Sequence, residues 1–244
     1  MRTSNPTLSD STFSKVAAGV TNPMTLQGTV NKTALLLMIL LVPAAYTWNA
    51  TMANPAASGM YIAVGAIVGL ILAVITSFKM EWSPITAPLY AAAEGVFLGA
   101  ISARYNMVYE GIVLQAVMLT CGTLLGLLAA YSMRLIKATE NFKLGIVAAT
   151  GGIMLVYLAT MVLRMFNIDI PYIHGSGTVG IGFSVVVVII AALNLVMDFD
   201  FIENGCAQGA PKYMEWYASF GLLVTLVWLY LEMLRLLAKL ADRK

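Results

Sequence analysis

Long runs of apolar residues, separated by short polar linkers, dominate this chain of 244 residues. The hydrocarbon core of a bilayer takes about 20 apolar residues per helix, and seven runs come near that length. They cover residues 33–48, 60–78, 85–103, 111–133, 145–166, 177–197 and 217–238. We therefore predict an all-α integral membrane protein with seven spans.

The segments between the runs indicate a single membrane domain, residues 33–244. The linkers carry turn residues such as Asn54-Pro55 and Ser83-Pro84 and are too short to hold a second domain. Residues 1–32 hold few large apolar side chains and cannot bury enough surface to fold alone. We expect them to form a mobile tail or a surface helix.

Composition supports the membrane assignment, since 60% of the residues are hydrophobic and the mean hydropathy is +0.84. A net charge of +2 with no basic cluster argues against nucleic-acid binding, which needs a concentrated Lys and Arg surface. The chain has two cysteines and the single histidine His174. A zinc site built from Cys and His is therefore not expected.

Basic residues predict the orientation, because they favour cytoplasmic loops. If the N-terminus is cytoplasmic, the inner side holds Arg2, Lys15, Lys32, Lys79, Arg134, Lys137, Lys143 and Lys212. The outer loops then hold only Arg104 and Arg164. This predicts a multi-pass protein of the cell (inner or plasma) membrane. Four basic residues near the C-terminus fall outside if all seven runs cross, and inside if the seventh run is re-entrant.

The sixth run ends in three carboxylates within six residues, Asp198, Asp200 and Glu203. Charged groups inside a membrane are costly and are functional candidates. Residues two apart on a helix point about 200° from each other, so Asp198 shares a face with Asn194, and Asp200 shares one with Glu203. We expect Asp198 to be buried and Asp200 to lie near water. The alternative is that the three acids only mark where the helix leaves the membrane.

The seventh run carries a polar stripe at helical spacing, formed by Thr225, Trp228, Glu232, Arg235 and Lys239. This face is expected to point into protein or water. Glu232 and Arg235 are three residues apart and can neutralise each other on one helix. Alternatively, this helix is central and Glu232 supplies a carboxylate to an ion path.

Glu94 is another acid inside an apolar run, and it needs a partner across a helix interface. It can meet a backbone group or hydroxyl while protonated. The neighbouring Gly95 and Gly99 form a GxxxG pair, which indicates close helix packing.

Four segments together are similar to the Bax inhibitor-1 (TMBIM) superfamily, in its bacterial YccA-like branch. They are Val-Asn-Lys-Thr at 30–33, Glu94-Gly95, Asn-Leu-Val-Met-Asp-Phe-Asp-Phe-Ile at 194–202, and Leu-Tyr-Leu-Glu-Met-Leu-Arg-Leu-Leu at 229–237. With seven spans, the resemblance covers most of the chain.

The resemblance implies a seven-helix bundle with the last helix in the centre and a pH-sensitive calcium leak governed by two membrane aspartates. Asp198 corresponds to the family's aspartate on the sixth helix, with Asp200 as the alternative. Glu232 or Thr225 corresponds to the aspartate on the seventh helix, depending on how the last helix is aligned with the family. Lys79 matches the family's basic residue of the second span by location.

This resemblance leads to a specific gate. Two carboxylates that share a proton across helices would hold the path closed, and ionisation would drive them apart. Ca²⁺ accepts several oxygen ligands in irregular geometry, and Asp198, Glu232 and Asn194 are the expected sources. The transported ion is the only metal expected, with no cofactor.

The same resemblance also implies a second function class, a non-channel modulator that binds a membrane protease or another membrane protein, with residues 1–32 as the contact. A transporter for a small solute is a third class, but the chain shows no paired broken helices with Gly or Pro interruptions in matching positions. An intramembrane enzyme is a fourth class. The spans contain no Ser/His or Cys/His pair and no His-Glu-x-x-His spacing, so we do not expect an enzyme.

Overall fold

The computed structural model describes residues 22–166 and 175–243, and within them seven helices are long and apolar enough to cross a membrane. These helices are α2 (Leu26–Ala53), α3 (Ser58–Phe78), α4 (Ser83–Val108), α5 (Ile112–Ser132), α6 (Glu140–Met165), α8 (Thr178–Ala207) and α9 (Met214–Ala241). The 3₁₀ turns η1 (Pro55–Ala57) and η2 (Met80–Trp82) lead into α3 and α4. The predicted all-α fold with seven spans is confirmed.

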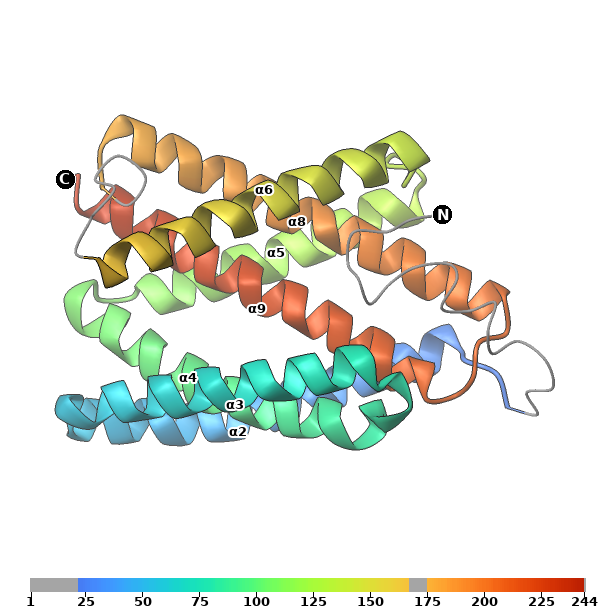
Figure 1. Ribbon diagram of the computed structural model, residues 1–244, viewed down its shortest axis with the longest axis horizontal. Coiled ribbons are helices and arrows are strands. Elements are labelled where there is room, and N and C mark those ends of the chain that lie inside the picture. Colours follow the sequence, from blue (N-terminus) through green and yellow to red (C-terminus); the bar gives the residue numbers. More distant parts are fainter. Residues whose placement is uncertain (1–21, 167–174, 244) are drawn as a thin grey trace.

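The last helix lies in the centre of the bundle. In Figure 1, α9 runs between a layer that contains α2, α3 and α4 and another that contains α5, α6 and α8. It packs against α2, α4, α5 and α8. Its Leu223, Leu229 and Leu234 are completely buried, as the predicted bundle requires.

Glycines on α4 allow close packing with α2. A Cβ atom at Gly95 would lie 2.2 Å from the carbonyl oxygen of Leu40, and one at Gly99 would lie 2.1 Å from that of Ala44. Contacts this short are impossible, so any side chain at either position would push the two helices apart. The GxxxG pair therefore acts in helix packing, as expected.

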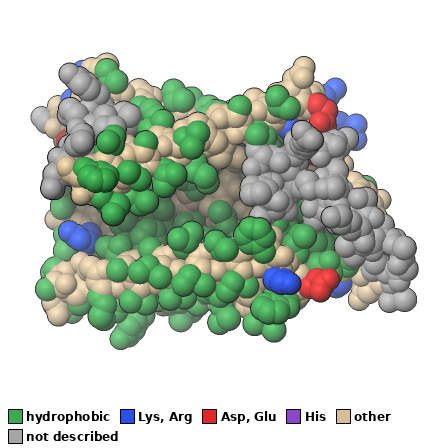
Figure 2. All heavy atoms as spheres, in the orientation of Figure 1, with side chains coloured by type: hydrophobic (Ala, Val, Ile, Leu, Met, Phe, Trp, Pro, Cys, Tyr) green, Lys and Arg blue, Asp and Glu red, His purple; other side chains and the backbone are tan. Residues whose placement is uncertain are grey.

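The outer faces of the helices are apolar. Met38 on α2, Leu70 on α3 and Met154 on α6 are 62%, 66% and 68% exposed. Figure 2 shows hydrophobic side chains spread over the whole length of the visible face. A surface of this kind is stable only against lipid chains.

The first helix begins earlier than predicted. Thr25 caps α2, because its hydroxyl accepts a 3.0 Å hydrogen bond from the Gly28 N–H. Residues 26–32, which the sequence placed in the tail, therefore form the first two turns of the first span. The rest of the predicted tail, up to residue 21, lies outside the described residues.

The sixth span ends later than predicted, at Ala207. The cluster Asp198 to Glu203 lies inside α8 rather than at its end, and Asn204 and Gly205 are helical instead of forming a turn. The helix continues because partner side chains on α5 and α6 contact Glu203 and Asp200. The chain turns instead at Gly209, where φ is 67°.

The seventh span crosses the bundle completely. Asp242, directly after α9, accepts hydrogen bonds from Tyr109, in the loop after α4, and Ser176, just before α8. The start of α9 lies at the other end of the molecule, where α2 also begins (Figure 1). The re-entrant alternative is therefore wrong, and Lys239 and Arg243 lie at the end that carries Arg104.

Candidate functional site: a buried carboxylate between the sixth and seventh helices

Asp198 is buried where α8 packs on α9, with 5% of its surface exposed. Its carboxyl group interacts with the hydroxyl of Thr225 on α9. The oxygen Oδ2 is buried and has no hydrogen-bond partner among the described residues. Burying such an oxygen without a partner is unfavourable, most of all when the group is charged. The predicted burial of Asp198 is confirmed, and its free oxygen is unusual.

The hydroxyl of Thr225 on α9 lies beside the Asp198 carboxyl. Thr225 itself donates to the carbonyl oxygen of Gly221 at 3.3 Å. Thr225 is 8% exposed, so this group of oxygens is screened from the outside in the structure. Carboxylate and carbonyl oxygens are ligand types that Ca²⁺ prefers.

Glu232, the other expected gate carboxylate, has different partners. Its two oxygens accept hydrogen bonds from Arg235 at 2.8 and 3.0 Å, and Oε1 also accepts one from Tyr157 on α6 at 3.0 Å. Arg235 also donates to the Tyr157 hydroxyl at 2.5 Å. In the part of the chain that the structure describes, Asp198 and Glu232 share no hydrogen bond.

The helix geometry explains this separation. Thr225 and Glu232 are seven residues apart, which is about 10 Å along a helix. Asp198 faces Thr225, so Glu232 lies two turns further along α9. The structure therefore shows Glu232 paired with Arg235, which was one of the two predicted alternatives. The expected pair of carboxylates, Asp198 with Glu232, is not formed.

Asn194 does not extend the site around Asp198. Its amide donates to the Thr150 hydroxyl on α6 at 2.9 Å and to the Ile190 carbonyl oxygen at 2.8 Å. Its side chain therefore joins α8 to α6. Within residues 22–166 and 175–243, no three Asp, Glu, His or Cys side chains gather as a metal site. Asn194 and Glu232 bind partners other than Asp198, so the expected trio of calcium ligands is not assembled in this structure.

Asp200 is partly exposed and ion-paired. Its carboxylate lies 2.6 Å from the ammonium of Lys143 on α6 and accepts a 2.9 Å hydrogen bond from Asn204. Side-chain exposure is 20% for Asp200 and 9% for Lys143. The expected separation of roles holds, because Asp198 is buried without a charged partner and Asp200 is neutralised near the surface.

Two further candidates from the sequence, Glu94 and Lys79, belong to other helices than Asp198 and Thr225. Glu94 on α4 is half-buried, interacts with the Tyr90 hydroxyl and faces Gly69 of α3, where a Cβ atom would lie 2.8 Å from Oε1. Lys79 ends α3 and is exposed. Among the described residues, neither has an interaction with the Asp198 carboxyl. Glu94 meets a hydroxyl, but Tyr90 lies four residues earlier on α4 itself, so this hydroxyl is not the expected partner across a helix interface.

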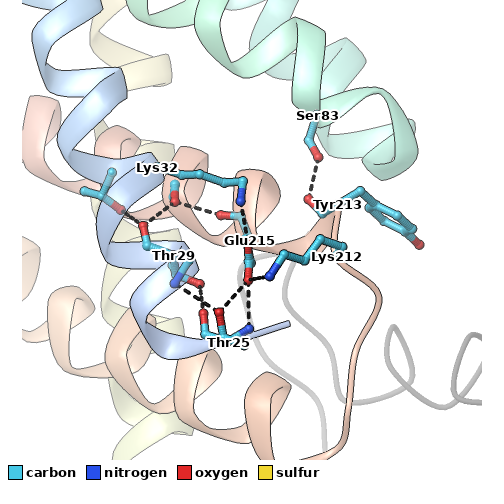
Figure 3. Close-up of polar contacts among 10 residues, drawn as sticks. Thr25, Thr29, Lys32, Ser83, Lys212, Tyr213 and Glu215 are labelled. Carbon is cyan, nitrogen blue, oxygen red and sulfur yellow. Dashed lines mark hydrogen bonds and ion pairs between the residues drawn. The ribbon is translucent and has the colours of Figure 1, made fainter. Parts of the chain in front are cut away.

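Sequence reasoning missed Glu215, in the first turn of α9. Its side chain is completely buried and accepts hydrogen bonds from the Thr25 N–H at 2.9 Å and the Thr25 hydroxyl at 2.8 Å. Lys32 of α2 and Lys212 both pair with it, the latter at 2.8 Å (Figure 3). A Cβ atom at Gly28 would lie 2.1 Å from Oε1, so a glycine is needed for this approach.

The position of Glu215 explains why it was missed. It precedes the predicted start of the seventh run, so it looked like a loop residue. The one available signal was the spacing of Lys212 and Glu215, three residues apart before an apolar run. Its main partners are on α2, and only the folded chain brings them together.

Comparison with known proteins places the chain in a family. Residues 5–242 match the family model described as Bax inhibitor 1 like. Neither the curated proteins nor the solved structures gave a match. Because the family model covers nearly the whole chain, this protein belongs to the Bax inhibitor 1 like family.

Proposed function

We propose that this protein is a cation leak channel, with Ca²⁺ the favoured ion, and that a protonated Asp198 keeps its path closed. The supporting observation is the carboxyl oxygen Oδ2 of Asp198, which is buried without a partner among the described residues. A charged carboxylate in this position would be costly, whereas a neutral carboxylic acid fits. The closed arrangement is therefore the one that carries a proton.

Ionisation of Asp198 would favour another arrangement. A buried carboxylate is stabilised by water or a cation, and either can enter only if α8 and α9 separate locally. Thr225 lies beside the carboxyl and the Gly221 carbonyl oxygen lies beside Thr225, so further oxygen ligands are available. Ion flux is then expected to rise as the pH rises.

In this mechanism Asp198 acts without a second carboxylate. Glu232 is already neutralised by Arg235 and bonded by Tyr157. Its role is to hold α9 against α6 through Tyr157, while Asp198 alone changes charge. The gate is thus simpler than the carboxylate pair that the sequence led us to expect.

Flux measurements in liposomes test the proposal. Purified protein is reconstituted into vesicles that contain a calcium-sensitive dye, and Ca²⁺ is added outside over a series of pH values. We expect uptake above that of protein-free vesicles, increasing with pH. Uptake equal to that of protein-free vesicles at every pH would exclude the leak and leave the modulator of a membrane protease as the working hypothesis.

The finer classification is also part of this proposal. We place the chain in the bacterial YccA-like branch on the strength of residues 30–33, and in the cell membrane with a cytoplasmic N-terminus. The end of the bundle where α2 begins also carries Lys79, Arg134, Lys143 and Lys212, which supports this orientation.

A further inference from the structure

A groove opens on the side of the bundle near the end where α2 begins. Its volume is about 990 Å³, at the upper end of the roughly 300–1,000 Å³ typical of ligand sites. The lining comes from the first half of α2, the second half of α5, the loop between α5 and α6, and the last turns of α8, with Leu222 of α9.

The walls of the groove are apolar and accessible from the membrane. Val30 on α2 and Leu125 and Leu128 on α5 line it and are 52%, 64% and 42% exposed. In a bilayer, lipid chains cover such side chains. The groove therefore has the surface chemistry that accepts an acyl chain.

The mouth of the groove is polar and carries four charged side chains. The two acids are already bonded, Asp200 to Lys143 and Glu203 to the Tyr131 hydroxyl. The two cations, Arg134 and Lys137, are exposed, and neither has an acidic partner within the described residues. The available charge at the mouth is therefore positive.

The backbone at Arg134 supports a role for its side chain. Arg134 has φ of 57°, in the left-handed region that favours glycine. Its N–H bonds the Tyr131 carbonyl oxygen at 2.9 Å, and the Leu135 N–H bonds that of Ala130 at 2.9 Å. This is the Schellman ending of a helix, in which glycine is the usual residue. Arginine is less favourable than glycine in this backbone conformation, so the fold alone does not explain its presence.

We propose that the groove binds an anionic phospholipid from the inner leaflet, with the headgroup phosphate between Arg134 and Lys137 and an acyl chain against Leu125 and Leu128. Arginine and lysine bind phosphate oxygens through charge-assisted hydrogen bonds, and basic pockets between membrane helices recognise anionic headgroups in this way. This site goes beyond the proposed leak and does not depend on it.

Native mass spectrometry of the protein from nanodiscs tests the site. With equal amounts of phosphatidylglycerol and phosphatidylcholine, the protein is expected to retain phosphatidylglycerol preferentially. Each basic residue near an anionic surface contributes roughly fivefold to binding, so Arg134→Gln with Lys137→Gln is expected to lower retention by about 30-fold. Lys79→Gln is the control, because Lys79 is exposed at the same end but does not line the groove.

Two further arms distinguish a lipid held in the groove from an anion held by surface charge alone. Leu128→Trp fills the groove and is expected to lower retention without changing the charge. Inorganic phosphate is expected to leave retention unchanged, because it offers no acyl chain. Equal retention of both lipids, equal loss in Lys79→Gln, or full displacement by phosphate would each overturn the proposal.

The variant Arg134→Gly separates a loss of lipid binding from a loss of folding. Glycine suits the left-handed position, so this variant is expected to unfold in detergent at the same or a higher temperature than the unchanged protein. It is nevertheless expected to retain about fivefold less phosphatidylglycerol. Unchanged lipid retention in a stable Arg134→Gly variant would contradict the assignment of Arg134.

Discussion

The cluster around Glu215 joins the first and last helices, and we predict that replacing Glu215 by alanine destabilises the protein strongly. Glu215 is completely buried, and it is the acceptor for Thr25, Lys32 and Lys212. Its removal leaves the Thr25 N–H and the Lys32 ammonium, whose side chain is 18% exposed, without their acceptor. Breaking a buried charge pair by removing one partner destabilises by about 3–5 kcal/mol.

Two further variants show how much each interaction of Glu215 contributes to the free energy of unfolding. Glu215→Gln keeps an oxygen for Thr25 but loses the charge, and a lost hydrogen bond to a charged group is worth about 1.5–3 kcal/mol. The side chain of Lys212 is 43% exposed, so solvent screens this pair and Lys212→Met is expected to lower stability by less than about 1 kcal/mol. The predicted order of destabilisation is Glu215→Ala, then Glu215→Gln, then Lys212→Met.

Equilibrium unfolding in mixed detergent micelles, followed by circular dichroism, measures these differences. Hydrogen exchange at the first turns of α2 provides a second readout, because the loss of Glu215 frees that end of the helix. If Glu215→Ala is no less stable than Lys212→Met, the cluster does not hold α2 to α9 and the reasoning is refuted.

Two other predictions concern packing and pH. Gly99→Val is expected to destabilise the bundle by more than about 3 kcal/mol, because its side chain would overlap the backbone of α2. Gly126→Val is the control and is expected to be nearly neutral, because a Cβ atom at Gly126 would have nothing within 4 Å. Unfolding in micelles compares the two variants. Hydrogen bonds from Tyr109 and Ser176 lower the pKa of Asp242 below its usual value. A carboxyl group whose pKa is lower in the folded than in the unfolded protein stabilises the folded state at any pH above its unfolded pKa of about 3.9. This stabilisation is lost as the pH falls through the folded pKa. Hydrogen exchange at the end of α9 is therefore expected to stay constant from neutral pH down to about pH 4 and, after correction for the intrinsic rate, to increase below it; an increase near neutral pH would contradict this.

The sequence predicted the number of helices because each span must be apolar over a length set by the bilayer. It misplaced the ends of two spans for a related reason. Residues 26–32 and 204–207 are polar enough to look like a tail and a linker, but both are helical in the structure. Partners on other helices, such as Glu215 for Lys32 and Lys143 for Asp200, satisfy the charges in these helix ends, and no local pattern in the sequence reveals such partners.

The candidate site was predicted in part. Helical geometry separated Asp198 from Asp200 correctly, since a rotation of about 200° places them on different faces. The partner of Asp198 depends on how far α8 is shifted along α9, and a polar stripe with a seven-residue interval fits both Thr225 and Glu232. The structure places Asp198 against Thr225. The pairing of Glu232 with Arg235 was one of the two local alternatives, whereas the contribution of Tyr157 from α6 was not predictable.

The most direct test of the proposed mechanism is the pH dependence of Ca²⁺ flux in Asp198→Asn, with Asp200→Asn as the matched control. Asparagine cannot ionise, so the account predicts that Asp198→Asn loses the rise of flux with pH and stays near its low-pH level. Asp200 is paired with Lys143 outside the proposed gate, and its variant is expected to keep the rise. A flux curve in Asp198→Asn that matches the unchanged protein at every pH would contradict the central claim.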